Sequence, residues 1–209
     1  MATSIAAGRS NVAVGKQKLI DAALRLGARG TGLDGIGLRE LAREAGLNPT
    51  TFYCHFDSME HLAQTVAEAA AAQIMAGIQD VRAHVAKHAD VTRCSVEFFL
   101  DFVVKQPDVF RVGLRELHGG SPAIRAILRR VLDQIAEESV EQIEHFDLMP
   151  GADRALLRQA TGGVTYYMFY RALDCAERPQ LRAALADEMV QYIRMVFTGS
   201  RALATVVSG

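Results

Sequence analysis

Apolar residues recur along this chain with the period of an α-helix. Within residues 16–29, the apolar positions Ala23, Leu24 and Gly27 follow Ile20 by three, four and seven residues, which places all four on one side of a helix. The strict alternation typical of a half-buried strand is rare. Only five prolines interrupt the 209 residues, and helix-favouring Ala, Leu, Glu and Arg are abundant. We therefore predict an all-α protein.

The N-terminal part of the pattern predicts three helices. The glycine-rich stretch 30–35 ends the first, and a second follows over residues 38–45 with the same apolar spacing. After a short turn, Asn48 can cap a third helix. Pro49 suits the first position of that helix, because proline has no N–H to leave unpaired there. The third helix should run for about two turns, through Phe56.

Longer helices are predicted in the rest of the chain. They span residues 59–84, 91–106, 108–118, 122–145, 153–174 and 179–201. The change from short to long helices predicts a flexible arm over residues 1–15, a head of three helices over residues 16–57 and a larger helical domain over residues 58–209.

The composition narrows the classes of protein that remain. Half of the residues are hydrophobic and 22% are charged, which excludes a wholly disordered chain. The 23 Lys and Arg against 24 Asp and Glu exclude a polybasic nucleic-acid scaffold, although residues 1–57 hold seven basic and five acidic side chains. The three cysteines are widely spaced, and no apolar run is long enough to span a membrane. We expect a cytoplasmic protein without disulfides, metal or cofactor.

The second and third predicted helices have the proportions of a helix-turn-helix. Such a pair, joined by a short turn, places its second helix in the major groove of DNA. The third helix carries short or rigid polar side chains, which suit hydrogen bonds to phosphates and base edges. The candidate DNA-binding residues are Arg39, Asn48, Thr50, Thr51, Tyr53 and His55. Tyr53 and His55 can alternatively pack within the head, and for His55 both interpretations stay open.

The stretch from Leu38 to Phe56 resembles the DNA-binding signature of the TetR family of transcriptional repressors. The resemblance rests on the helix-turn-helix spacing, on the run from Thr51 to Phe56 and on a first helix that ends near Gly30. It implies about nine helices, a homodimer built on the last two, a palindromic operator and an inducer pocket in the larger domain. Three positions depart from the family pattern: Gly37, Cys54 and Met59.

Part of the larger domain is similar to a subgroup of that family that senses long-chain acyl-CoA and controls unsaturated fatty-acid synthesis. The similarity lies in residues 98–102, 106–111 and 114–116, and it implies a repressor with an acyl-CoA ligand. The aromatic residues suit a long apolar cavity with a few hydroxyl groups, although aromatics at helical spacing can instead belong to the core. The candidate ligand-binding residues are Phe98, Phe99, Phe102, Phe110, Leu114, Tyr166, Tyr167 and Tyr170.

Charged residues in the larger domain allow two further interpretations. Arg111 and Arg115 can hold a coenzyme A phosphate, or they can form an exposed pair near Glu116. Asp80, His84 and His88 stand at helical spacing, as metal ligands can, but they coincide with the predicted end of a helix. We favour the exposed pair for the two arginines and a solvated helix end for the other three residues.

Two alternatives to a ligand-controlled repressor stay open. One is a dimeric DNA-binding regulator that responds to no ligand, and the other is a helical enzyme. We expect no enzyme, because the sequence has no P-loop, GxSxG, HExxH or Glu-x-x-His motif. In the dimer, we expect apolar faces of the last two helices to meet their copies. The residues expected there are Leu156, Leu157, Val164, Leu173, Leu181, Leu185, Met189, Tyr192, Ile193 and Val196.

Overall fold

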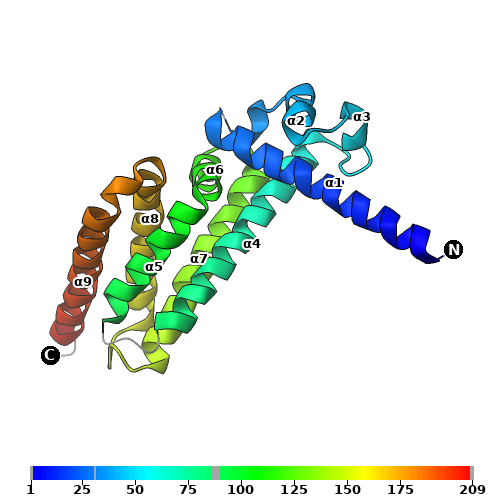
Figure 1. Ribbon diagram of the computed structural model, residues 1–209. Coiled ribbons are helices and arrows are strands. Elements are labelled where there is room, and N and C mark those ends of the chain that lie inside the picture. The colour runs from blue at the N-terminus through cyan, green and yellow to red at the C-terminus, as the bar shows by residue number, and fades with distance from the viewer. Residues whose placement is uncertain (1, 31, 86–89, 208–209) are drawn as a thin grey trace. The chain divides into compact units, whose positions relative to one another are not determined.

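A computed structural model describes residues 2–30, 32–85 and 90–207, with side chains described from residue 13 to residue 200 except 31, 81 and 84–89 (Figure 1). The elements are α1 (Ala2–Arg29), the 3₁₀ turn η1 (Leu33–Gly35), α2 (Leu38–Ala45), α3 (Pro49–Phe52), α4 (Met59–Val85), α5 (Val91–Lys105), α6 (Pro107–Leu117), α7 (Pro122–His145), α8 (Arg154–Glu177), the 3₁₀ turn η2 (Pro179–Leu181) and α9 (Arg182–Val207). This part of the chain therefore has nine α-helices and no strand. The prediction of an all-α protein is confirmed.

The first helix is longer than the sequence pattern predicts. α1 begins at Ala2, whereas we expect a flexible arm over residues 1–15 and a helix from Lys16. No proline interrupts this segment. Its glycines, Gly8 and Gly15, stand singly, and each costs a helix only about 1 kcal/mol relative to alanine. The alanine-rich start therefore continues the helix instead of ending it.

The third helix is shorter than predicted. α3 comprises four residues instead of about two turns. After Phe52 the hydrogen bonds tighten, because the N–H groups of Cys54 and His55 donate to carbonyls three residues earlier, at 3.2 and 2.9 Å. The segment through His55 thus continues as a tight turn.

The chain forms two compact units. The first unit comprises residues 1–72 and 111–128, and the second comprises residues 73–110 and 129–209. The predicted boundary at residue 57 lies inside the first unit. The divisions between these two units fall within α4, α6 and α7. Because these are continuous helices, no linker composition marks the divisions in the sequence.

The first unit is built on the apolar face of α1. Leu19 and Ala22 are fully buried there, and α2 and α3 pack against the same helix. Phe52 and Phe56 are each 1% exposed, and their ring centroids lie 5.7 Å apart. Leu41 of α2 is also fully buried. A few large side chains therefore hold this small head together.

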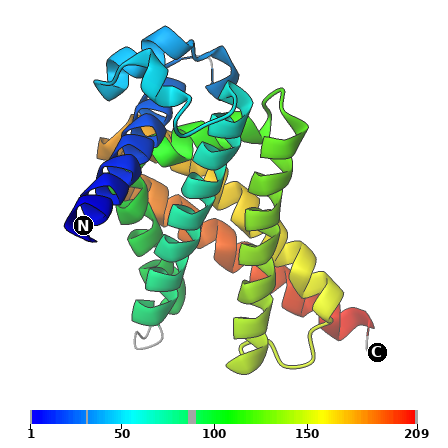
Figure 2. The same cartoon turned by 90° about the vertical axis from the view of Figure 1, so that its right-hand side faces the viewer.

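The second unit joins α5 to both α8 and α9, and α8 packs along α9. The last two helices are coloured gold to red in Figures 1 and 2. The buried positions of α8 that define its inward face are Leu157, Thr161, Val164, Thr165, Phe169, Ala172, Cys175 and Ala176. They recur at helical spacing, so one face of α8 belongs to the core of this unit.

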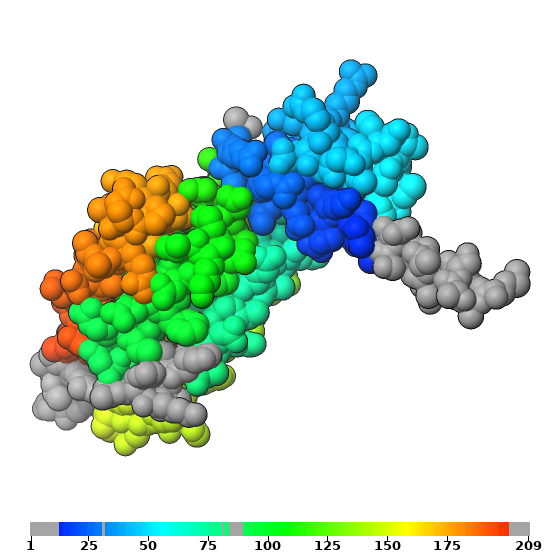
Figure 3. Space-filling model, viewed as in Figure 1, coloured from blue at the N-terminus to red at the C-terminus, as the bar shows by residue number. Residues whose placement is uncertain are grey.

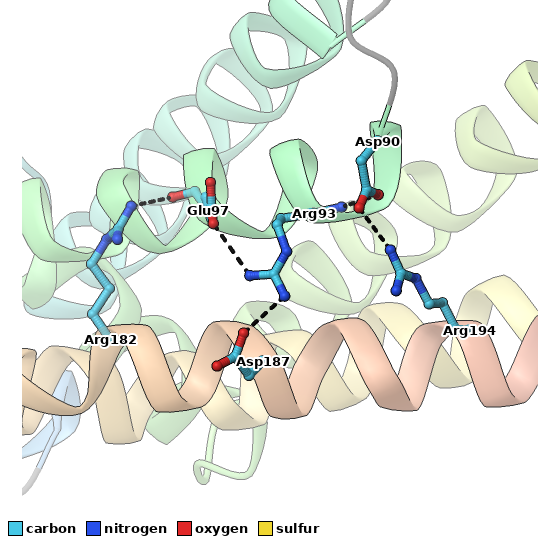
Figure 4. A network of polar contacts seen from close by, with 6 residues as sticks. All are labelled: Asp90, Arg93, Glu97, Arg182, Asp187 and Arg194. Carbon is cyan, nitrogen blue, oxygen red and sulfur yellow. Dashed lines mark hydrogen bonds and ion pairs between the residues drawn. The ribbon is translucent and has the colours of Figure 1, made fainter.

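Charged side chains connect α5 with α9 (Figure 4). Arg93 donates to Asp187 at 2.8 Å, and Arg194 donates to Asp90 at 2.7 Å. Arg182 donates to a backbone carbonyl of α5 at 3.2 Å. Each contact is partly exposed and contributes little singly, but the three together fix the register of α9 on α5.

Candidate nucleic-acid interface

Gly46 and Asn48 determine the turn between α2 and α3. Gly46 has φ +66°, a left-handed conformation that favours glycine, and it ends α2. The next N–H donates to the carbonyl of Ala42 at 2.9 Å, which satisfies a carbonyl at the end of α2. Asn48 caps α3, because its side-chain oxygen accepts the N–H of Thr50 at 2.9 Å. These contacts orient α3 relative to α2.

α3 and the turn after it have one buried face and one exposed face. Phe52 is 1% exposed, whereas the neighbouring Tyr53 is 67% exposed. The two rings meet edge to face, with centroids 5.3 Å apart, so Tyr53 is supported at its base without being covered. Asn48 and Thr50 are exposed as well. The outward face therefore presents a rigid phenol and short polar groups.

His55 lies between the α3 turn and α1. Its side chain is half-buried, and a Cβ atom added to Gly15 of α1 would lie 2.7 Å from its Nε2. The missing side chain of Gly15 makes the room that the imidazole occupies. This packing favours the interpretation in which His55 holds the α3 turn against α1.

The candidate residues differ in their exposure. Arg39, Asn48, Thr50 and Tyr53 are exposed, and Thr51 and His55 are half-buried. Figure 3 shows the atoms of α2 and α3 in light blue and cyan, open to the viewer. The α2–turn–α3 segment therefore brings four exposed candidates onto one short stretch of the head.

An ion pair that the sequence pattern does not indicate fixes α2 on α1. Arg25 Nε donates to Glu44 Oε1 at 2.7 Å, and Arg29 lies 3.9 Å from the same oxygen. The hydrogen bond from Arg25 lowers the pKa of the Glu44 carboxyl below its ordinary value. Arg25 and Glu44 are 19 positions apart, so no helical spacing marks them as partners.

Aromatic rings from α5, α6 and α8 meet in the core of the second unit. Phe99 and Phe110 are each 1% exposed, with ring centroids 5.7 Å apart. Phe169 packs on both at 5.5 and 5.7 Å, and Phe102 lies 5.5 Å from Phe110. A Cβ atom on Gly77 would lie 2.6 Å from a ring carbon of Phe102, so this ring lies directly against α4. We call these four phenylalanines the ring cluster.

The candidate tyrosines of α8 are not part of the ring cluster. Tyr166 and Tyr170 are 48% and 59% exposed, which corrects the expectation that they line an interior cavity. They lie outside because α8 turns another face inward. The Tyr167 hydroxyl donates to Glu188 at 2.8 Å, and its ring stacks on Tyr192 at 3.9 Å. Burial, together with the Glu188 carboxylate, raises the pKa of Tyr167 to about 12.

Some of the other candidate ligand-binding residues belong to the ring cluster and some do not. Phe99, Phe102 and Phe110 lie together, whereas Phe98 is half-buried on α5 and Leu114 is half-buried in the first unit. Phe169 completes the cluster, and the sequence pattern does not single it out. Apolar side chains surround α8, so periodicity alone selects no face of that helix.

Arg115 contacts backbone carbonyls at the end of α1. Its guanidinium donates to the carbonyl of Gly27 at 2.6 Å and to the carbonyl of Gly30. Both acceptors lie at the end of α1, within the first unit. Arg115 is still exposed, as the exposed-pair interpretation expects, whereas the neighbouring Glu116 is only 3% exposed.

Several residues expected between two copies of the chain are buried inside a single copy. Leu157, Val164, Leu185, Met189 and Ile193 are at most 9% exposed. Among the described side chains of α8 and α9, the large apolar ones that are exposed are Tyr166, Tyr170 and Met195. Cβ atoms added to Gly162 and Gly163 of α8 would meet nothing within 4 Å.

No metal site is found among the described side chains. Within them, no group of three His, Cys, Asp or Glu residues could hold an ion. His88 and the side chain of His84, which form part of the spacing considered from the sequence, lie outside the described part. None of the described helices combines the length and apolar character needed to cross a bilayer.

Comparisons with known proteins agree with this geometry. Residues 19–66 match the family model of the bacterial regulatory proteins, tetR family. A transcriptional regulator from Rhodococcus sp. RHA1 is 16% identical, with a TM-score of 0.69 over 89% of this chain and 97% of its own. A tetR-family regulator from Streptomyces coelicolor is 20% identical, with a TM-score of 0.65 over 90% of this chain and 82% of its own.

A third similar structure is FadR from Bacillus subtilis, a transcriptional regulator solved in complex with stearoyl-CoA. It is 17% identical, with a TM-score of 0.63 over 85% of this chain and 96% of its own. The three structures are of transcriptional regulators and not of enzymes. Residues 19–66 therefore match the tetR family of bacterial regulatory proteins, and the fold of the chain is similar to that of these solved transcriptional regulators.

Proposed function

We propose that this protein is a homodimeric repressor that binds a palindromic operator through the outward face of α3 and responds to a long-chain acyl-CoA. The proposal rests on the contrast between a buried and an exposed aromatic side chain at the end of α3. Tyr53 is 67% exposed beside Phe52, which is 1% exposed. In a helix-turn-helix the second helix enters the major groove, and an exposed ring with a hydroxyl group at this position is suited to contact DNA there.

The outward face of α3 has the chemistry for reading DNA. Asn48, Thr50 and Tyr53 offer hydrogen-bonding groups at the exposed end of the head. Hydroxyl and amide groups of this kind contact phosphates and base edges. Arg39 of α2 is also exposed and suits a phosphate contact. Thr51 and His55 are half-buried and would support the helix that makes these contacts.

Selection of duplexes from a random-sequence library tests operator binding. The enriched duplexes should contain an inverted repeat whose half-sites lie about 34 Å apart, or a multiple of that distance. Transcription from a promoter that overlaps the repeat should fall when the protein is added. Absence of any enriched sequence would reject the proposal, and enrichment with increased transcription would reject the repressor role.

The homodimer is supported by the side chains that α8 and α9 leave uncovered. Tyr166, Tyr170 and Met195 are at least 48% exposed, and such apolar groups are typical anchors of protein interfaces. The open space beside Gly162 and Gly163 allows the backbone of another helix to come close. A second copy placed here would present two heads to one duplex.

The acyl-CoA ligand is supported by the ring cluster and by one comparison. Four phenylalanines gather in one unit, and Phe102 is half-buried at their edge. Burial of each CH₂ of an acyl chain is worth about 0.8 kcal/mol, which would favour a chain inserted among these rings. FadR from Bacillus subtilis was solved with stearoyl-CoA. Such a ligand changes DNA binding only if it prefers one conformation of the protein.

Titration of the protein–operator complex with acyl-CoAs of graded length tests the ligand. Phe102→Trp adds bulk against α4 and should shorten the chain that is accepted, whereas Phe102→Leu should lengthen it. Phe146→Leu changes a ring that is 54% exposed outside the cluster and serves as the control. If no acyl-CoA changes the operator affinity of any of these proteins, the ligand is rejected and a ligand-independent regulator remains.

A further inference from the structure

Arg115 and Glu116, adjacent near the end of α6, hold both sides of the break between α1 and η1. Arg115 donates to the carbonyl of Gly27 at 2.6 Å and to that of Gly30. Glu116 is 3% exposed, and its Oε1 accepts the N–H of Leu33 at 2.7 Å. All of these residues belong to the first unit. We call this arrangement the α6 clamp.

The two charges of the α6 clamp match the polarity of the helix ends that they meet. The last carbonyls of a helix carry partial negative charge, and the first N–H groups carry partial positive charge. Arg115 therefore stabilises the end of α1, and Glu116 stabilises the start of η1. The cap position of η1 is Gly32, which has no side chain to do this. The missing cap comes instead from α6, 83 positions away from Leu33.

Glycine residues make room for the buried carboxylate. A Cβ atom on Gly32, which has φ +106°, would lie 2.7 Å from Glu116 Oε1, and one on Gly119 would lie 2.7 Å from Oε2. Burial of a carboxylate is costly unless hydrogen bonds compensate for it. The bond from the Leu33 N–H is charge-assisted and therefore strong for its kind. The site is thus adapted to Glu116 in both shape and charge.

We propose that Arg115 and Glu116 are positioning residues for operator recognition. They fix the junction that leads from α1 through η1 into α2, and so they hold α2 and α3 in the arrangement that reads DNA. The inference rests on the proposed function. Non-specific binding depends mainly on charge, whereas sequence-specific binding also depends on geometry. Loss of the clamp should therefore weaken specific binding far more than non-specific binding.

The test measures the affinity of each variant for two duplexes, the one that the parent protein selects from a random library and one of unrelated sequence. Arg115→Ala and Glu116→Ala should each lower affinity for the selected duplex about tenfold, which equals about 1.4 kcal/mol. Affinity for the unrelated duplex should stay within about twofold. Glu116→Gln keeps an acceptor oxygen for the Leu33 N–H and should restore most of the specific affinity.

Asp133→Asn removes an exposed carboxylate on α7 and serves as the matched control, and thermal unfolding establishes that each variant folds. If Glu116→Ala does not fold, Arg115→Ala decides the question. The inference is overturned by unchanged specific affinity, by equal losses on both duplexes or by unfolding of both alanine variants. A parent protein that selects no duplex would reject the proposed function, and the inference with it.

Discussion

Tyr53 is exposed because its neighbour Phe52 takes the inward position on α3. Replacement of Tyr53 by Phe keeps the ring and its edge contact with Phe52 but removes the hydroxyl. A hydrogen bond of this kind is worth about 0.5–1.5 kcal/mol, so we expect operator affinity to fall about threefold to tenfold. Thermal stability should not change, because the hydroxyl lies on an exposed side chain.

Phe146→Leu is the control for this measurement. Phe146 is 54% exposed and lies on none of α3, α8 and α9, so the change alters an exposed ring to which we assign no contact. Fluorescence anisotropy with the selected duplex should give the parent affinity for this control. If Tyr53→Phe also binds the selected duplex with the affinity of the parent protein, the Tyr53 hydroxyl does not contact DNA.

Asn48 is expected to act on stability as well as on DNA. Its side chain accepts the N–H of Thr50, and loss of such a cap costs about 0.5–2 kcal/mol. We expect Asn48→Ala to lower the thermal midpoint of the free protein, and Asn48→Ser, which can cap the helix, to restore it. Calorimetry of the three proteins measures this, and identical midpoints would show that the cap contributes nothing.

At the scale of elements, the joint between α1 and α2 should respond to pH. The pKa of Glu44 is below its ordinary value of 4.5, first because of the hydrogen bond from Arg25. A carboxyl whose pKa is lowered by folding stabilises the folded state above the unfolded pKa, and this contribution is lost as pH falls through the folded pKa. We expect the parent to lose thermal stability below pH 4.5 more steeply than Glu44→Gln does.

The comparison with Glu44→Gln isolates this carboxyl. Asp90 and Glu137 also have lowered pKa values because of hydrogen bonds from Arg93 and Arg154, but they titrate equally in both proteins. Unfolding curves recorded across the acid range should therefore diverge only as Glu44 becomes protonated. Parallel curves for the two proteins would contradict the role given to the Arg25–Glu44 pair.

Element positions follow from local rules more often than side-chain partners do. The turn at Gly46 and the cap at Asn48 are visible in the sequence, because a left-handed glycine and a side-chain cap act within a few residues. The contact between Glu116 and Leu33 spans 83 positions and has no local mark. For the same reason the sequence could not indicate that α8 turns Phe169 inward and leaves Tyr166 outside.

For the whole molecule, we expect a dimer that α8 and α9 hold together. A charge placed at Tyr170 would be buried without a partner between the two copies, which costs several kcal/mol. Tyr170→Asp should therefore give a monomer in light scattering at concentrations where the parent is a dimer. Phe146→Asp introduces the same charge at a side chain that is 54% exposed and lies outside both α8 and α9. This control should remain dimeric.

The Tyr170→Asp monomer should also bind the selected duplex weakly, because one head contacts only one half-site. A parent protein that is already a monomer would contradict the dimer. So would a Tyr170→Asp variant with the mass of the parent assembly. Either result would leave the proposed DNA contacts of α3 unaffected. An inverted repeat in the operator would no longer be expected, because that repeat follows from the dimer.

The central claim is that the outward face of α3 meets base edges in the major groove. Photocrosslinking to the selected duplex tests it most directly, with 5-iodouracil substituted for thymine so that the iodine occupies the major-groove position of the methyl group. Mass spectrometry then identifies the attached peptide. We expect crosslinks to the peptide that contains Tyr53, and the loss of these crosslinks in Tyr53→Ala. Crosslinks confined to peptides outside residues 38–55 would contradict this contact.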